Sequence, residues 1–157
     1  MVTVKWLGGM AFEATPPSGN KLVMDSHPDS GGHDRGPTPV ETLLSSLAGC
    51  TAMDILSILE KKRQTVKTYR VEIEGDRPVV EGEWPRPFTA IRLRHIFSGL
   101  DLDPVAVARA IALSETKYCT VLATLRLGPP VTSTFEIQGL EDLVGAEKVE
   151  NVGDQRY

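Results

Sequence analysis

The stretch Thr38-Pro-Val-Glu-Thr-Leu-Leu-Ser-Ser-Leu-Ala-Gly-Cys50 carries the signals that decide the fold. Thr38 can cap a helix with its hydroxyl, Pro39 suits the first helical position, and Glu41 completes a capping box. Apolar residues then recur at helical spacing, and a basic run follows where the helix dipole favours positive charge. We therefore predict a long apolar helix from Thr38 to about Lys62, with Cys50 on or beside its buried face.

Short segments on both sides of this helix alternate apolar and polar residues at strand period. Three precede it, separated by turn-forming residues, and they predict an antiparallel meander: 2–7, 10–15 and 21–25. Three follow it, of which the first two are expected to pair: 69–75, 89–97 and 131–138. The polar segment 26–37 between meander and helix is predicted to be an exposed loop.

A second helix is predicted from the sequence Asp103-Pro104, which repeats the combination of a capping residue and a first-turn proline. We expect it to end near Tyr118, which leaves Cys119 at its C-terminal end. Residues 121–125 can continue as helix before the Gly-Pro-Pro sequence that follows. Two groups of strands and two substantial helices predict an α+β fold.

Size and composition are typical of a globular protein of one domain, which we place at residues 1–138, followed by an acidic segment at 139–157 that is frayed or a short helix. The net charge of −4 makes nucleic acid an unexpected partner. The N-terminus resembles a strand rather than a signal peptide, and polar residues interrupt the apolar run 43–59, so no membrane span is expected. We expect a cytoplasmic protein with reduced thiols.

The chain has two cysteines, Cys50 and Cys119, and each lies on a predicted helix. A buried cysteine is usually a small core residue, but two thiols can also act as a nucleophile and the partner that resolves it. The second role requires a cation that stabilises a thiolate, whereas Asp54, one turn from Cys50, has the wrong charge. The nearest cation in sequence is Arg35, and the open alternatives are Arg70, Arg92, Arg94 or a residue of another subunit.

Glu41 could orient such an arginine, but its position in the capping box already explains it. On a straight helix, Glu41 and Cys50 would lie on opposite faces and about 13 Å apart along the axis. Only a break near Gly49 or Ser45-Ser46, or a contribution across an interface, would bring them together.

The loop before the long helix contains several residue types that bind divalent metals. The candidate ligands are Asp25, His27, Asp29, His33 and Asp34. Their spacing matches no compact ligand motif, so we expect a solvated loop and no metal site. A metal-dependent activity is only a minor alternative. His95 alternates within a predicted strand, which indicates a structural residue.

Several motifs together resemble the osmotically induced protein C and organic hydroperoxide resistance family. They are Gly36-Pro-Thr-Pro-Val-Glu-Thr-Leu-Leu, Ala48-Gly-Cys50, Pro87-Phe-Thr, Leu102-Asp-Pro and Arg109-Ala-Ile-Ala-Leu-Ser-Glu-Thr-Lys-Tyr-Cys119. The resemblance covers roughly residues 36–134, and the glycine-proline opening looks most like the less-studied, general members of the family.

This resemblance implies an intertwined homodimer in which two cysteine-bearing helices pack centrally between antiparallel sheets, with active sites at the subunit interface. It also implies reduction of organic hydroperoxides in preference to hydrogen peroxide, as part of a stress response and without metal, flavin or haem. Cys50 matches the peroxidatic cysteine and Cys119 the resolving cysteine, so we expect the two to meet. The implied reductant is a dithiol, in some members a lipoylated protein.

One departure from the family concerns the carboxylate. In the hydroperoxide reductases a glutamate directly follows the proline of the helix start, whereas here Val40 holds that position and Glu41 follows. With Glu41 taken as the replacement for that glutamate, we assign the catalytic set as Cys50, Cys119, Arg35 and Glu41. An apolar substrate tail is expected near Leu43, Leu47 and Met53. The alternative is a non-catalytic stress protein of the same fold that binds a small apolar ligand at its dimer interface.

Overall fold

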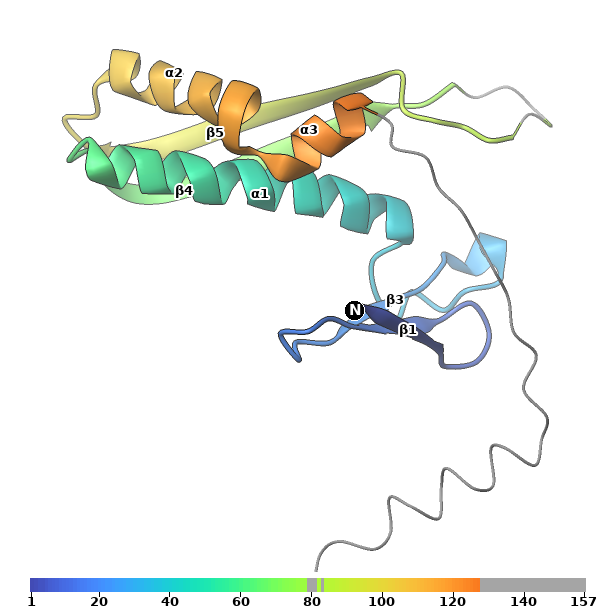
Figure 1. The fold of residues 1–157 in the computed structure, drawn as a ribbon. Coiled ribbons are helices and arrows are strands. Elements are labelled where there is room, and N and C mark those ends of the chain that lie inside the picture. Colours follow the sequence, from blue (N-terminus) through green and yellow to red (C-terminus); the bar gives the residue numbers. More distant parts are fainter. Residues whose placement is uncertain (79–81, 83, 128–157) are drawn as a thin grey trace, which may run out of the picture. The chain divides into compact units, whose positions relative to one another are not determined.

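The computed structural model describes residues 1–78, 82 and 84–127. The predicted strand at 131–138 and the acidic segment at 139–157 lie outside the described residues. The order of the described elements is three short strands, a short 3₁₀ turn η1 (Pro28–Ser30), one long helix, two long strands and a broken helical segment. This order confirms the predicted α+β class (Figure 1).

The N-terminal strands β1 (Thr3–Trp6), β2 (Phe12–Thr15) and β3 (Leu22–Met24) form an antiparallel sheet in the order β1-β2-β3. Consecutive strands pair because only short turns separate them, so the predicted meander is confirmed. Every residue of β1 is exposed, including Val4 and Trp6. This sheet therefore presents apolar side chains that the described residues do not cover.

The loop between β3 and the long helix is organised by one buried carboxylate. Asp25 is 2% exposed, and its oxygens accept hydrogen bonds from the backbone N–H groups of Ser26, His33 and Arg35 at 2.8, 3.1 and 3.2 Å. Gly32 is also buried, and a Cβ there would collide with the backbone of Ser26, so the close approach requires glycine. The loop is mostly exposed, as predicted, but its path is fixed from within.

Helix α1 (Pro39–Lys61) begins as the sequence predicts. The Thr38 hydroxyl accepts a hydrogen bond from the Glu41 N–H at 3.2 Å, and the Glu41 carboxylate accepts one from the Thr38 N–H at 2.7 Å. The buried side chains recur every fourth residue and form one stripe: Leu47, Thr51, Ile55 and Leu59. The helix is continuous, and it packs against β4 and the next helix, α2.

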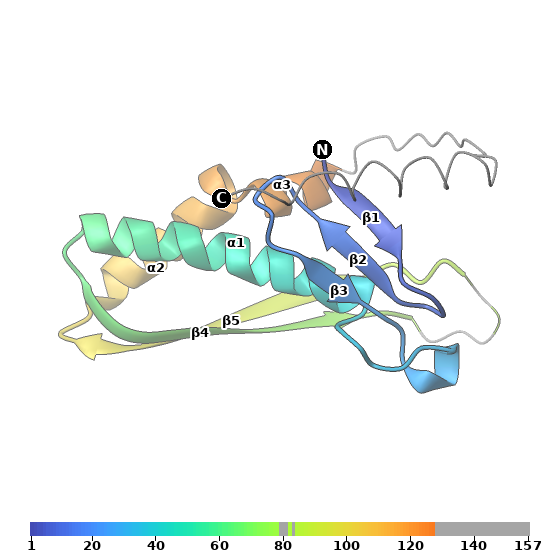
Figure 2. The same cartoon turned by 90° about the horizontal axis from the view of Figure 1, so that it is seen from below.

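The long strands β4 (Thr65–Asp76) and β5 (Ala90–Leu100) pair as an antiparallel ribbon, which confirms their predicted pairing. Tyr69 and Phe97 face each other across the ribbon, with ring centroids 4.2 Å apart. Their rings join a core around Ile55 and Leu59, where each fully buried side chain contributes about 1.5–3 kcal/mol. Figure 2 shows α1 running along this ribbon.

Helix α2 (Pro104–Leu113) starts as predicted, with the Asp103 carboxylate accepting a hydrogen bond from the Val105 N–H at 2.9 Å. A π-helical turn, η2 (Ser114–Tyr118), follows directly. The backbone then becomes extended at Cys119 and coils again as α3 (Thr120–Leu127). The helix thus ends near Tyr118, as predicted, and α3 is a separate element rather than its continuation.

By length and composition, α1 is the one helix of the described part of the chain that could cross a membrane, with a mean hydropathy of 1.6. Core helices meet the same criterion. Only 22% of that stretch is buried within this chain, and several large apolar side chains are exposed on it: Leu43, Met53 and Leu56. The helix therefore has a face that the described residues leave open.

Candidate functional site

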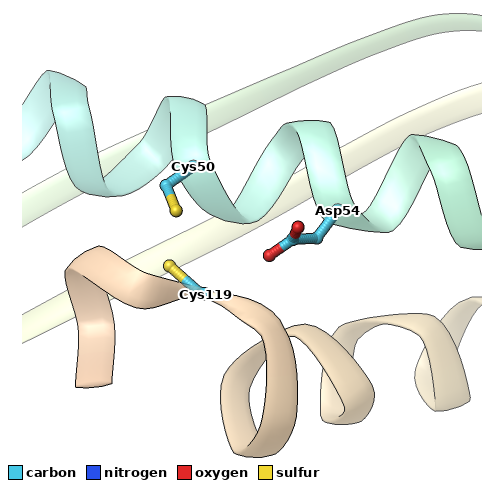
Figure 3. Close-up of side chains that lie close together, drawn as sticks. All are labelled: Cys50, Asp54 and Cys119. Atoms are coloured by element: carbon cyan, nitrogen blue, oxygen red, sulfur yellow. The ribbon is translucent and has the colours of Figure 1, made fainter.

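The two cysteines, 69 positions apart in the sequence, face each other in the structure (Figure 3). Cys50 lies in the middle of α1 and is half-buried, whereas Cys119 lies between η2 and α3 and is 3% exposed. Both are free thiols. Their sulfur atoms and a carboxylate oxygen of Asp54 all lie within 4.8 Å of one another.

The π-helical turn accounts for the position of Cys119. The Cys119 N–H donates to the Ser114 carbonyl at 2.9 Å, a bond that spans five residues instead of four. Five residues of regular α-helix would rotate Cys119 about 140° away from the face that carries Ser114. In the wider turn, Ser114 and Cys119 are both buried on the side of α1.

Asp54 joins the thiols because it follows Cys50 by one helical turn and so lies on the same face of α1. The Ser114 hydroxyl donates a hydrogen bond to the Asp54 carboxylate at 3.1 Å and thereby orients it. From the sequence, Asp54 is only a charge of unfavourable sign near Cys50, and Ser114 is not identified as a site residue. The spacing of Cys50 and Asp54 was a usable signal, whereas nothing in the sequence pattern indicated Ser114.

The electrostatic environment keeps the buried thiol protonated. Burial raises the pKa of the Cys119 thiol, and the neighbouring Cys50 thiol and Asp54 carboxylate raise it further. The Leu122 N–H, in the first turn of α3, donates to the Cys119 sulfur at 3.4 Å and opposes this effect. The net direction is upward, so Cys119 is a neutral thiol near pH 7.

A mostly apolar hollow of about 230 Å³ lies between α1, β5 and α3, and neighbours of the thiols rather than the thiols themselves line it. Its walls include one cation, Arg126, and six large apolar residues: Leu47, Phe88, Ile91, Leu93, Leu122 and Leu125. Leu47 precedes Cys50 by three residues on α1, and the Leu122 N–H contacts the Cys119 sulfur. Of the three residues expected around a substrate tail, Leu47 lines this hollow, whereas Leu43 and Met53 are exposed.

The histidine-containing loop is held by its own hydrogen bonds. His27 pairs with Asp34 at 2.8 Å, and this interaction raises the pKa of His27. The carboxylate oxygens of Asp25 accept hydrogen bonds from three backbone N–H groups. Among the residues that the structure describes, the three side chains close enough to share one metal ion are Cys50, Asp54 and Cys119, and none of them lies in this loop.

A model of the OsmC-like protein family matches residues 31–134, which is most of the described chain and includes both cysteines. The chain belongs to the OsmC-like family. It is 40% identical over 134 residues to protein YhfA of Escherichia coli strain K12, a match that covers 85% of this chain and 95% of that protein.

Solved structures of the OsmC-like fold agree with this assignment. A hypothetical protein from Aquifex aeolicus is 26% identical, with a TM-score of 0.68, and the match covers 88% of this chain and 95% of that one. An organic hydroperoxide resistance protein from Legionella pneumophila shares the fold at 15% identity, with a TM-score of 0.59 and coverage of 80% and 89%. The family and fold that the sequence motifs predicted are therefore confirmed.

Two further residues were assigned to the site: Glu41 from the family resemblance, and Arg35 as the nearest cation in sequence. Glu41 belongs to the capping box, and nine residues of uninterrupted α1 separate it from Cys50. Arg35 is exposed ahead of the helix. In the part of the chain that the structure describes, no hydrogen bond or ion pair joins either side chain to Cys50, Asp54 or Cys119. Their catalytic roles stay predictions.

The other arginines considered for the site have carboxylate partners on the ribbon. Arg92 pairs with Glu74 and Asp76, and Arg70 and Arg94 both pair with Glu72. Arg126, which the sequence analysis did not consider, lines a hollow of about 260 Å³ together with Cys119. Its guanidinium donates to the Glu115 carbonyl at 2.9 Å.

Proposed function

We propose that this OsmC-like protein is a thiol-dependent peroxidase that reduces organic hydroperoxides to alcohols. The observation that carries the proposal is the pair of free thiols, one half-buried and one buried, that face each other near a mostly apolar hollow. Membership of a family that includes a protein named for organic hydroperoxide resistance supports the same chemistry.

The reaction has three steps. The Cys50 thiolate attacks one peroxide oxygen, the O–O bond breaks, and the alcohol leaves with a proton, so Cys50 becomes a sulfenic acid. The Cys119 sulfur then attacks the Cys50 sulfur, loses its proton and displaces water, which leaves a disulfide. An external dithiol, such as a lipoylated protein, donates two electrons and two protons to restore both thiols.

The assignment of roles follows from exposure. Cys50 is half-buried and is the thiol that a substrate can reach, whereas Cys119 is 3% exposed and has a raised pKa. A buried neutral thiol is protected from peroxide and suits the second step, in which its partner is the neighbouring sulfenic acid. We therefore assign Cys50 as the peroxidatic residue and Cys119 as the resolving residue.

The mostly apolar hollow near the thiols supports an apolar substrate. Its aliphatic and aromatic walls would bind a hydrocarbon tail through the hydrophobic effect, whereas hydrogen peroxide gains nothing from such walls. Discrimination between organic and inorganic peroxides would therefore come from binding energy beside Cys50 rather than from the thiol itself.

We further propose a homodimer in the reducing cytoplasm. The exposed apolar side chains of β1, of the residue before it and of α1 favour a second copy as cover: Val2, Val4, Trp6, Leu43, Met53 and Leu56. A second copy is also a possible source of the cation that a Cys50 thiolate requires, because the Arg35 and Glu41 of the same chain do not bond to the cluster.

The test is intact-mass analysis and thiol titration before and after one equivalent of cumene hydroperoxide, with hydrogen peroxide in parallel. We expect rapid loss of both thiols and a mass loss of about two hydrogens per chain with the organic peroxide. Cys50→Ser should abolish turnover, and Cys119→Ser should stop the cycle at an oxidised Cys50. Multiple turnover by the Cys50→Ser variant would overturn the proposal.

A non-catalytic, ligand-binding member of the family is the second candidate. The feature that favours it is the carboxylate of Asp54, rather than a cation, beside the sulfur atoms. If Cys50 reacts with the organic hydroperoxide no faster than free cysteine does, this second candidate replaces the first.

A further inference from the structure

The cluster of Cys50, Asp54 and Cys119 has a feature that peroxidase chemistry does not use. Two sulfur atoms and one carboxylate oxygen lie within 4.8 Å of one another, so one ion could contact all three (Figure 3). Thiolate and carboxylate are both ligands of Zn²⁺, and two sulfurs favour zinc over magnesium or calcium.

The ligand atoms are held in place by the fold. Cys50 and Asp54 are one turn apart on α1, a spacing that directs two side chains to one point. Cys119 is fixed by the π-helical turn and by the Leu122 N–H, and Asp54 is oriented by the Ser114 hydroxyl. A hydrogen-bond partner that orients a ligand in this way is typical of metal sites.

Among the described residues, no cation pairs with the cluster, and Arg126, which lines a hollow together with Cys119, donates to the Glu115 carbonyl instead. Each of the three members of the cluster becomes negative when it ionises. In the described part of the chain, the hydrogen-bond donor to Asp54 is the neutral Ser114 hydroxyl, and no lysine or arginine makes an ion pair with Asp54. Lys61 and Lys62 line the same hollow as Asp54 without pairing with it.

We propose that the reduced protein binds one Zn²⁺ per chain through Cys50, Cys119 and Asp54, with the fourth tetrahedral position open to water. Binding displaces the two thiol protons, because thiolates are the ligands. Formation of the disulfide removes two of the three ligands, so metal binding and oxidation of the pair exclude each other. The inference does not depend on the proposed peroxidase activity.

The experiment is titration of the reduced, full-length protein with Zn²⁺ in competition with a chromophoric chelator, and in parallel with Co²⁺. We expect one Zn²⁺ per chain and a Co²⁺ spectrum with the charge-transfer bands of thiolate ligands and the visible bands of a tetrahedral site. Protein oxidised with diamide, which takes up the two electrons and two protons released by disulfide formation, should not bind.

Variants separate a three-ligand site from simple binding to a thiol pair. Asp54→Asn should weaken zinc binding by roughly tenfold or more, and Cys50→Ser or Cys119→Ser by roughly a hundredfold or more. Asp29→Asn changes an exposed aspartate of the histidine-containing loop and should leave the affinity unchanged. Circular dichroism of each variant confirms that it is folded.

Two results would overturn the proposal. One is zinc affinity in Asp54→Asn equal to that of the unmodified chain, which would leave only a thiol pair. The other is a Co²⁺ complex without thiolate bands, or one that survives the loss of either cysteine. Peroxide reduction is measured separately on chelator-treated protein, so failure of the zinc site and failure of the peroxidase are distinguishable.

Discussion

Two aspartates of this chain are withdrawn from solvent to different extents and have different partners. Asp25 is almost fully buried and accepts three backbone hydrogen bonds, whereas Asp54 is half-buried, accepts one hydroxyl hydrogen bond and faces two sulfur atoms. The first carboxylate has its acceptor capacity used by the loop that it organises. The second keeps capacity for a proton or an ion. The hydrogen-bond partners of a carboxylate, more than its burial, distinguish a structural carboxylate from one that is available to bind a proton or an ion.

The largest effect that tests this comparison is expected at Asp25. Asp25→Asn replaces one acceptor oxygen with an NH₂ group that points at backbone donors, and should lower the midpoint of thermal unfolding by on the order of 10 °C. Differential scanning calorimetry measures it, with Asp29→Asn as the exposed control. A change of only one or two degrees would contradict the structural role.

The pH dependence of the same variant sharpens the test. Burial raises the pKa of Asp25, but the three N–H donors outweigh burial and hold the pKa below its ordinary value of 3.8. The ionised form therefore stabilises the fold above that value, and this contribution is lost as the pH falls through the folded-state pKa. Asp25→Asn should unfold with a shallower dependence on pH below about 4.

At Asp54 we expect a smaller effect, on thiol reactivity rather than on folding. Because the Asp54 carboxylate helps to raise the pKa of Cys119, Asp54→Asn should lower that pKa and speed alkylation of Cys119 roughly two- to tenfold near pH 7. The rate is measured by mass spectrometry in a Cys50→Ser background. Ser114→Ala removes the hydroxyl but keeps the charge and should change the rate less.

The smallest expected effect concerns a half-buried polar pair on the ribbon. Burial raises the pKa of Tyr69 to about 12, so its hydroxyl stays protonated and can donate to His95 Nδ1, 2.7 Å away. Burial lowers the pKa of His95, although Glu115 opposes this. The neutral ring therefore stabilises the fold above the ordinary histidine pKa of about 6.5, and this contribution is lost as the pH falls through the folded-state pKa.

His95→Gln should flatten the fall in unfolding temperature between about pH 6.5 and pH 5. His27→Gln is the matched control, because the pKa of His27 is raised by Asp34 and the sign of its contribution is reversed. An unchanged slope in the His95 variant would show that protonation of this ring does not affect stability.

The sequence predicted the fold well where local chemistry decides it. The capping box at Thr38 and Glu41 predicted the start of α1, and alternation predicted all five described strands. The site was predicted in part. The motifs identified the two cysteines as site residues. The contact between Cys50 and Cys119, however, depends on a π-helical turn, and no periodic pattern of residues in the sequence indicates such a turn. The Ser114–Asp54 hydrogen bond spans 60 residues, beyond the reach of local patterns.

The π-helical turn has a consequence for how the distance between the thiols can change. A helix advances about 100° per residue, so one residue fewer between Ser114 and Cys119 would restore the regular four-residue spacing and keep both on the side of α1, whereas one residue more would turn the second sulfur away. A chain lengthened in this way should keep two reactive thiols that mild oxidation no longer cross-links within one molecule. In this region of the protein, the number of residues is itself a functional parameter, because an insertion separates the thiols while every ligand and nucleophile is retained.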